Sequence, residues 1–106
     1  MTGLEKLADV LKITPEDASL RLAKVLPRLA QELLVTPDDA ALRLAKVLTQ
    51  ATEPESEIIT FRFGLDAGII RTLEETCEAC SSTREQVRQI EQKALGRMRH
   101  PLFLTD

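Results

Sequence analysis

The stretch Thr83-Arg-Glu-Gln-Val-Arg-Gln-Ile-Glu-Gln-Lys-Ala-Leu95 decides the fold of this chain. Apolar residues recur within it and just beyond it at three- and four-residue spacing: Val87, Ile90, Ala94 and Met98. A stripe of this kind indicates a helix with one buried face. Thr83 followed by Gln86 forms a capping box, which marks a helix start. The stretch therefore predicts a helix over about 84–99, ended by His100-Pro101.

The polar residues of this helix fall on the face opposite the apolar stripe: Arg84, Glu85, Arg88, Gln89 and Gln92. A helix that reads DNA needs an apolar back, which packs on its own domain, and a front of side chains that donate to and accept from base edges. The pattern is therefore typical of a recognition helix.

The preceding residues predict a second, shorter helix and the turn between the two. Thr72 followed by Glu75 is another capping box, so a helix is expected over about Leu73 to Cys80. Before it, an apolar segment beginning at Ile58 ends at Gly64, and residues 64–71 are expected to form a loop. The polar, acidic segment 50–57, which contains Pro54, is expected to be a boundary or the start of a helix.

The first 50 residues contain an internal repeat. Ile13-Thr-Pro-Glu-Asp-Ala-Ser-Leu-Arg-Leu-Ala-Lys-Val-Leu26 returns, 22 residues later, as Val35-Thr-Pro-Asp-Asp-Ala-Ala-Leu-Arg-Leu-Ala-Lys-Val-Leu48. Thr14 and Thr36 are expected to cap helices that begin with proline and two acidic residues. Apolar segments at 4–11 and 29–34 precede them, so each unit is predicted to be helix, tight turn, helix. Pro27 either breaks the second helix or opens the third.

Two copies do not make a solenoid, which normally needs at least three. The repeats are interpreted as a helical packing or dimerisation module, with degenerate helix-turn-helix units as the alternative. Neither second helix carries an outward cluster of Arg, Asn or Gln. The predicted architecture is all-α, with a repeat module over residues 1–50 and a helix-turn-helix domain over residues 51–106.

Composition narrows the class of protein. A chain of 106 residues forms one domain or two small ones. Aromatic residues make up only 3%, so the core must use Leu, Ala, Val and Ile at helical spacing. No apolar run of about 18 residues and no leader pattern is present, so a cytoplasmic location without a membrane, and reduced cysteines, are expected.

Charge argues in two directions. The net charge of −3 and the pI near 5.2 by themselves argue against nucleic-acid binding. The last predicted helix, however, carries five basic residues against two acidic ones: Arg84, Arg88, Lys93, Arg97 and Arg99 against Glu85 and Glu91. Because salt screens distant charges, a local basic face attracts phosphate although the whole chain is acidic.

These residues together resemble region 4 of the primary bacterial sigma factors. The likeness runs in order through Arg62-Phe-Gly-Leu-Asp66, Thr72-Leu-Glu-Glu75, the stretch 83–95 and Met98-Arg-His-Pro101, and covers about residues 53–101. In that family the first helices hold the flap of the RNA polymerase β subunit, and the recognition helix enters the major groove of the upstream promoter hexamer. The resemblance therefore implies RNA polymerase and promoter DNA as partners.

The resemblance also assigns roles to residues. Arg84, Glu85 and Gln89 match base-reading positions, and Arg88 matches a position that faces the groove and backbone. The complete set of residues predicted to bind DNA is Arg84, Glu85, Gln86, Arg88, Gln89 and Lys93.

The chain departs from the family pattern at several positions. Thr76, Cys77, Cys80 and Ser82 stand where the family has apolar residues or glycine, and Gly96 replaces a usual arginine. No counterpart of region 2 is present, so promoter melting is not expected of this chain.

Other chemistry has little support in the sequence. Cys77 and Cys80 are expected to be small buried thiols, with a redox or intermolecular metal role as the alternative, because a zinc site needs four ligands. His100 is expected to end the last helix. No catalytic motif is present, so we expect no enzyme activity, no cofactor and no metal.

Two functions remain open. One is a sigma-like transcription regulator that contacts the polymerase flap, promoter DNA or both. The other is an adaptor or sigma mimic, of anti-sigma type, that binds polymerase or a sigma factor without reading DNA. A homodimer through the N-terminal repeats is a further expectation, and an unrelated first half fused to the second is a third option.

Overall fold

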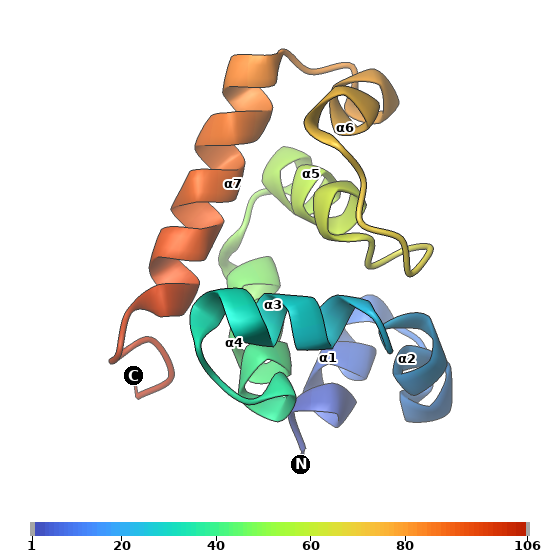
Figure 1. Ribbon diagram of the computed structural model, residues 1–106, viewed down its shortest axis with the longest axis vertical. Helices are drawn as coiled ribbons and strands as arrows, with labels where there is room; N and C mark the ends of the chain where they lie inside the picture. Colours follow the sequence, from blue (N-terminus) through green and yellow to red (C-terminus); the bar gives the residue numbers. More distant parts are fainter. Residues whose placement is uncertain (1, 106) are drawn as a thin grey trace.

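The structure, a computed structural model, describes residues 2–105, and within that range it has seven helices and no strand. The helices are α1 (Gly3–Leu11), α2 (Pro15–Arg21), α3 (Val25–Leu33), α4 (Pro37–Gln50), α5 (Glu53–Phe63), α6 (Leu73–Cys80) and α7 (Arg84–Arg99). Figure 1 shows α1–α4 at one end of the molecule, α5 in the middle, and α6 with the start of α7 at the other end. The prediction of an all-α fold is confirmed.

Threonine caps determine where most of the helices begin. In α1, α2, α4, α5, α6 and α7, the residue before the helix is a threonine whose hydroxyl oxygen accepts a backbone N–H three residues further on. Such a cap typically stabilises a helix by about 1 kcal/mol. The starts predicted at Thr14, Thr36, Thr72 and Thr83 are confirmed. Helix α3 has no side-chain cap.

The two copies of the repeat begin in the same way, but their second helices differ in length. Lys12 and Leu34 end α1 and α3 in the left-handed conformation, with φ of 61° and 60°. Helix α2 then stops at Arg21, whereas its counterpart α4 continues to Gln50.

Pro27 explains this difference. A proline ring inside a helix clashes with the carbonyl group four residues earlier, here that of Ala23, so α2 cannot run on through this segment. In the second copy the residue equivalent to Pro27 is Thr49, which a helix tolerates. Pro27 instead occupies the first turn of α3, where its missing N–H group would have no helical partner. It therefore ends one helix and allows the next to begin.

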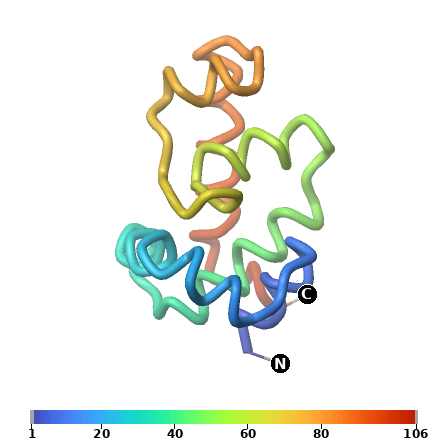
Figure 2. Tube along the Cα trace, turned by 90° about the vertical axis from the view of Figure 1, so that its right-hand side faces the viewer, coloured from blue at the N-terminus to red at the C-terminus, as the bar shows by residue number. Residues whose placement is uncertain are grey.

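One cluster of buried residues extends through both halves of the chain. Helix α4 lies at its centre and packs against α1, α3 and α7. Leu44 on α4 is fully buried. The C-terminal half contributes six residues to the same cluster: Ile59, Phe63, Leu65, Ala94, Leu95 and Met98. Figure 2, turned by 90°, also places the last part of α7 beside the N-terminal helices.

Within residues 2–105, none of the helices is both long enough and apolar enough to cross a membrane.

Candidate nucleic-acid interface

Helices α6 and α7 are joined by a tight turn, and together they form a helix-turn-helix. Ser81 ends α6 in the left-handed conformation, with φ 51° and ψ 42°. The N–H group of Ser82 donates to the carbonyl oxygen of Cys77 over 3.1 Å. Thr83 then caps α7 through the predicted capping box with Gln86. The turn is therefore fixed by hydrogen bonds on both sides.

The back of α7 is buried, as its apolar spacing predicts. Val87 and Met98 are fully buried, Ala94 is nearly so, and Ile90 is half-buried against the core. Thr76 on α6 is also fully buried, and its hydroxyl group donates to the carbonyl oxygen of Thr72 over 2.9 Å. The buried hydroxyl group of Thr76 therefore has a hydrogen-bond partner, although the residue occupies a position that is apolar in related sequences.

All six residues predicted to bind DNA are exposed. Five of them lie in the first two turns of α7, at the end of the molecule away from α1–α4 (Figure 1). Lys93 lies nine residues after Arg84, which is about 14 Å along the helix axis. The structure thus gathers Arg84, Glu85, Gln86, Arg88 and Gln89 into one patch, and Lys93 lies one helical turn beyond Gln89.

Within this patch, the side chains are held only by weak contacts. Arg84 Nη2 lies 3.2 Å from Glu74 Oε1, and the two side chains are 69% and 64% exposed. Such an exposed pair contributes little to stability, so the guanidinium group remains available to a ligand. Gln89 Nε2 donates to Glu85 Oε1 over 3.2 Å. Glu74 is a neighbour that the sequence analysis did not single out.

Gln86 and Lys93 already have partners inside the chain. Gln86 Oε1 accepts the N–H group of Thr83 over 3.0 Å, so one end of this amide serves the capping box. Lys93 Nζ lies 3.1 Å from Glu55 Oε2 on α5, and its side chain is 51% exposed. Lys93 therefore ties α7 to α5, and any DNA contact that it makes competes with this ion pair.

Two further ion pairs lie outside the patch, one between α5 and α7 and one within the loop between α5 and α6. Arg62 Nε lies 3.1 Å from Glu91 Oε2, which joins the end of α5 to the middle of α7. Arg71 pairs with Asp66 through both guanidinium nitrogens, at 2.7 Å and 3.0 Å. Burial raises the pKa of the Asp66 carboxyl group, but the hydrogen bond and charge of Arg71 outweigh burial and lower the pKa overall. The sequence analysis missed these pairs.

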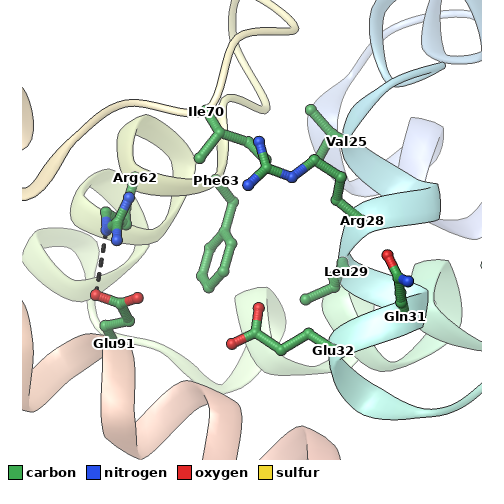
Figure 3. Close-up of a pocket in the computed structure, with 9 residues that line it drawn as sticks. All are labelled: Val25, Arg28, Leu29, Gln31, Glu32, Arg62, Phe63, Ile70 and Glu91. Carbon is green, nitrogen blue, oxygen red and sulfur yellow. Dashed lines mark hydrogen bonds and ion pairs between the residues drawn. The ribbon is translucent and has the colours of Figure 1, made fainter.

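The Arg62–Glu91 pair lies at the edge of a pocket of about 380 Å³ between α3, the end of α5 and α7 (Figure 3). Its lining is Val25, Arg28, Leu29, Gln31, Glu32, Arg62, Phe63, Ile70 and Glu91. The pocket is thus lined by both halves of the chain.

The capping box of α6 should make the helix-turn-helix sensitive to acid. Backbone and side-chain hydrogen bonds with Thr72 hold the pKa of Glu75 below its ordinary value of 4.5. A carboxylate with a lowered pKa stabilises the fold above the unfolded pKa, and this stabilisation is lost as the pH falls through the folded pKa. We expect Glu75→Gln to flatten the loss of thermal stability below about pH 4.5, because glutamine still accepts the hydrogen bond but does not titrate.

This expectation is measured as the thermal midpoint between pH 3 and pH 7. Glu78→Gln on the same helix is the matched control, because Glu78 is exposed and lies outside the capping box. Equal acid sensitivity in the two variants would contradict the role given to Glu75.

Gly96 is an exposed glycine within α7, and no described atom lies within 4 Å of a Cβ added there. We expect Gly96→Ala to stabilise the chain by up to about 1 kcal/mol, because alanine has the higher helix propensity. Gly64→Ala should instead destabilise it, since Gly64 has φ +73° and an added Cβ would clash with the backbone of Ile69. Urea unfolding followed by circular dichroism measures both changes.

The two cysteines correct one expectation. Cys77 and Cys80 are half-buried free thiols rather than core residues. Burial and the nearby Glu57 raise the pKa of the Cys80 thiol. The described residues hold no group of three potential metal ligands.

The fold and the patch define a helix-turn-helix protein whose second helix carries exposed polar side chains at its start. The family described as sigma-70, region 4 matches residues 47–100, just over half of the chain, and the chain belongs to this family. It is similar to the RNA polymerase sigma factor SigA of a Bacillus species, with 54% identity over 50 residues. No solved structure matches it significantly.

This similarity covers 47% of the chain and 13% of the SigA relative. The resemblance to sigma region 4 is thereby confirmed, whereas the remainder of that relative has no counterpart in the match.

Proposed function

We propose that this chain is a transcription regulator of sigma region 4 type, which contacts promoter DNA through the start of α7 and RNA polymerase through its region 4 helices. The observation that carries this proposal is the exposed patch of Arg84, Glu85, Arg88 and Gln89, mounted on a rigid helix. Promoter melting is not among the activities proposed for this chain.

The chemistry of the patch suits base reading. Arginine donates to guanine O6 and N7, glutamine pairs with adenine, and glutamate accepts from cytosine N4. Arg88 has no ion-pair or hydrogen-bond partner among the described residues, so its charge is free for phosphate or a base. The partial charges at the start of α7 further favour phosphate there.

The polymerase contact rests on the family and on the printed name of the SigA relative, an RNA polymerase sigma factor. In the family the flap of the β subunit is held by the first helices of region 4. In this chain we assign that role to α5 and the loop that follows it. A protein with these two contacts would bridge polymerase and an upstream promoter element.

An adaptor that binds polymerase or a sigma factor without reading DNA is the second candidate. The net charge of −3 and the exposed Gly96 in place of a basic residue favour it. A homodimer through the repeats has no support in the fold, because the apolar stripe of α4 is already buried within the chain.

Two binding measurements separate these candidates. The full chain is titrated against a labelled duplex that carries the upstream promoter hexamer, and separately against an isolated β-flap fragment. The regulator binds the promoter duplex better than a scrambled duplex of equal length. If the chain binds the flap fragment but shows no preference between the two duplexes, the adaptor is supported and the regulator is excluded.

A further inference from the structure

The same arginine of each repeat copy contacts the region 4 half of the chain. Arg21 Nη1 donates to the carbonyl oxygen of Leu65 over 3.4 Å. Arg43, 22 residues later, donates through Nη1 to the carbonyl oxygens of Met98 and His100, over 2.6 Å and 3.0 Å. The duplication has thus placed two equivalent side chains against two separate sites on region 4.

Both sites lie at, or just beyond, the C-terminal end of a helix. Leu65 follows Gly64, which caps α5, whereas Met98 lies in the last turn of α7 and His100 caps that helix. The last carbonyl groups of a helix have no partner within the helix, and they carry partial negative charge. An arginine fork satisfies such groups and complements their charge.

The contacts around each arginine are close. Near Arg21, a Cβ added at Gly68 would clash with the arginine's backbone oxygen, so the α5–α6 loop is seated directly on the end of α2. Near Arg43, Asp39 Oδ1 lies 3.3 Å from the guanidinium Nε and holds it in place. One turn along α4, the Lys46 ammonium group lies 4.8 Å from the centre of the Phe103 ring.

Between these two sites the pocket shown in Figure 3 lies between α3 and the end of α5, and Glu32 in its lining pairs with Arg99 on α7 over 3.6 Å, with both side chains about half exposed. The two arginines therefore join the repeat to region 4 at two separated points, in addition to this exposed ion pair and to the apolar packing of α4 on α7.

We propose that the N-terminal repeat is a binding module for region 4 in the same chain, and that Arg21 and Arg43 are its two equivalent contact points. The surface it recognises is apolar and is bordered by the carbonyl groups of Leu65, just after α5, and of Met98 and His100, at the end of α7. It leaves the start of α7 open, because Met98 lies about 21 Å along the helix from Arg84. This proposal does not depend on DNA binding.

The test is hydrogen exchange of the full chain, followed by mass spectrometry or NMR. Arg43→Ala is expected to speed exchange about tenfold at residues 95–100, and Arg21→Ala to do the same at residues 64–71, because each removes hydrogen bonds from a charged donor. The double variant should show both effects, with α1 unchanged. Lys24→Ala, an exposed position on the same module, is the control and should exchange like the unmodified chain.

Arg21→Lys with Arg43→Lys is the second variant, which keeps the charges if the alanine variants do not fold. Lysine has a single nitrogen and cannot pair with Asp39 through a separate one while it donates to the two carbonyl groups, so intermediate exchange at residues 95–100 is expected. Unchanged exchange in both segments, or an equal increase throughout the chain, would overturn the proposal. The proposal would also be overturned if protection from hydrogen exchange at these residues rose with protein concentration, because a second copy of the chain would then supply the contact.

Discussion

Replacing Leu44 with alanine is expected to lower the free energy of unfolding by about 2–5 kcal/mol. Leu44 is fully buried on α4, where the helices of the repeat meet α7. The substitution removes apolar contacts and leaves a cavity that the surrounding helices fill only in part. Because a domain of this size is stable by only about 5–15 kcal/mol, the loss is a large fraction of the total.

The measurement is urea unfolding followed by far-ultraviolet circular dichroism, which suits a chain without tryptophan or tyrosine. Leu20→Ala is the matched control, because Leu20 is 81% exposed on α2 and its loss should change stability by no more than about 0.5 kcal/mol. Equal effects of the two substitutions would show that α4 is not the centre of the core.

Arg84→Ala is expected to reduce the preference for the promoter duplex over a scrambled duplex by about 1–3 kcal/mol, or about 5- to 150-fold. The reason is that an arginine pairs in a bidentate manner with one guanine, and alanine cannot replace those hydrogen bonds. Fluorescence anisotropy with the two labelled duplexes measures the preference directly.

Two controls separate base reading from general attraction. Arg84→Lys keeps the charge but not the planar fork, so it should bind the scrambled duplex as before while its extra affinity for the promoter duplex is lost. Arg97→Ala, at an exposed position near the other end of α7, should leave the preference for the promoter duplex unchanged, because any effect of its charge is the same for both duplexes. A preference that survives in Arg84→Ala would remove this residue from the base-reading set.

The helices could be predicted from the sequence because their signals are local. Thr72 with Glu75, and Thr83 with Gln86, fix the starts of α6 and α7 through groups only three residues apart. The apolar spacing of α7 likewise predicts its buried face. The exposure of Arg84 and Arg88 follows from the same periodicity, since they lie off the apolar stripe.

The contacts between the halves could not be predicted in this way. Arg21 and Arg43 occupy equivalent positions of the repeat, but their partners lie 44 and 55 residues further along the chain. Because every residue has a backbone carbonyl group, the sequence does not indicate which of them an arginine contacts, and only the fold shows it. The ion pair of Arg62 with Glu91 also depends on how α5 crosses α7.

The burial of the two cysteines could not be predicted from the sequence either. Their helical spacing places Cys77 and Cys80 near one face, but how deeply a short helix sinks into the core depends on its neighbours. Both thiols are half-buried.

The most direct test of the central claim is the affinity of the full chain for the promoter duplex and a scrambled duplex, measured across a range of salt concentrations. We predict tighter binding to the promoter duplex at every salt concentration. We also predict that the logarithm of the affinity falls linearly with the logarithm of the salt concentration, with a slope of about −0.9 for each phosphate neutralised. Binding that is absent even at low salt, or equal for both duplexes, would contradict the claim that α7 reads promoter DNA.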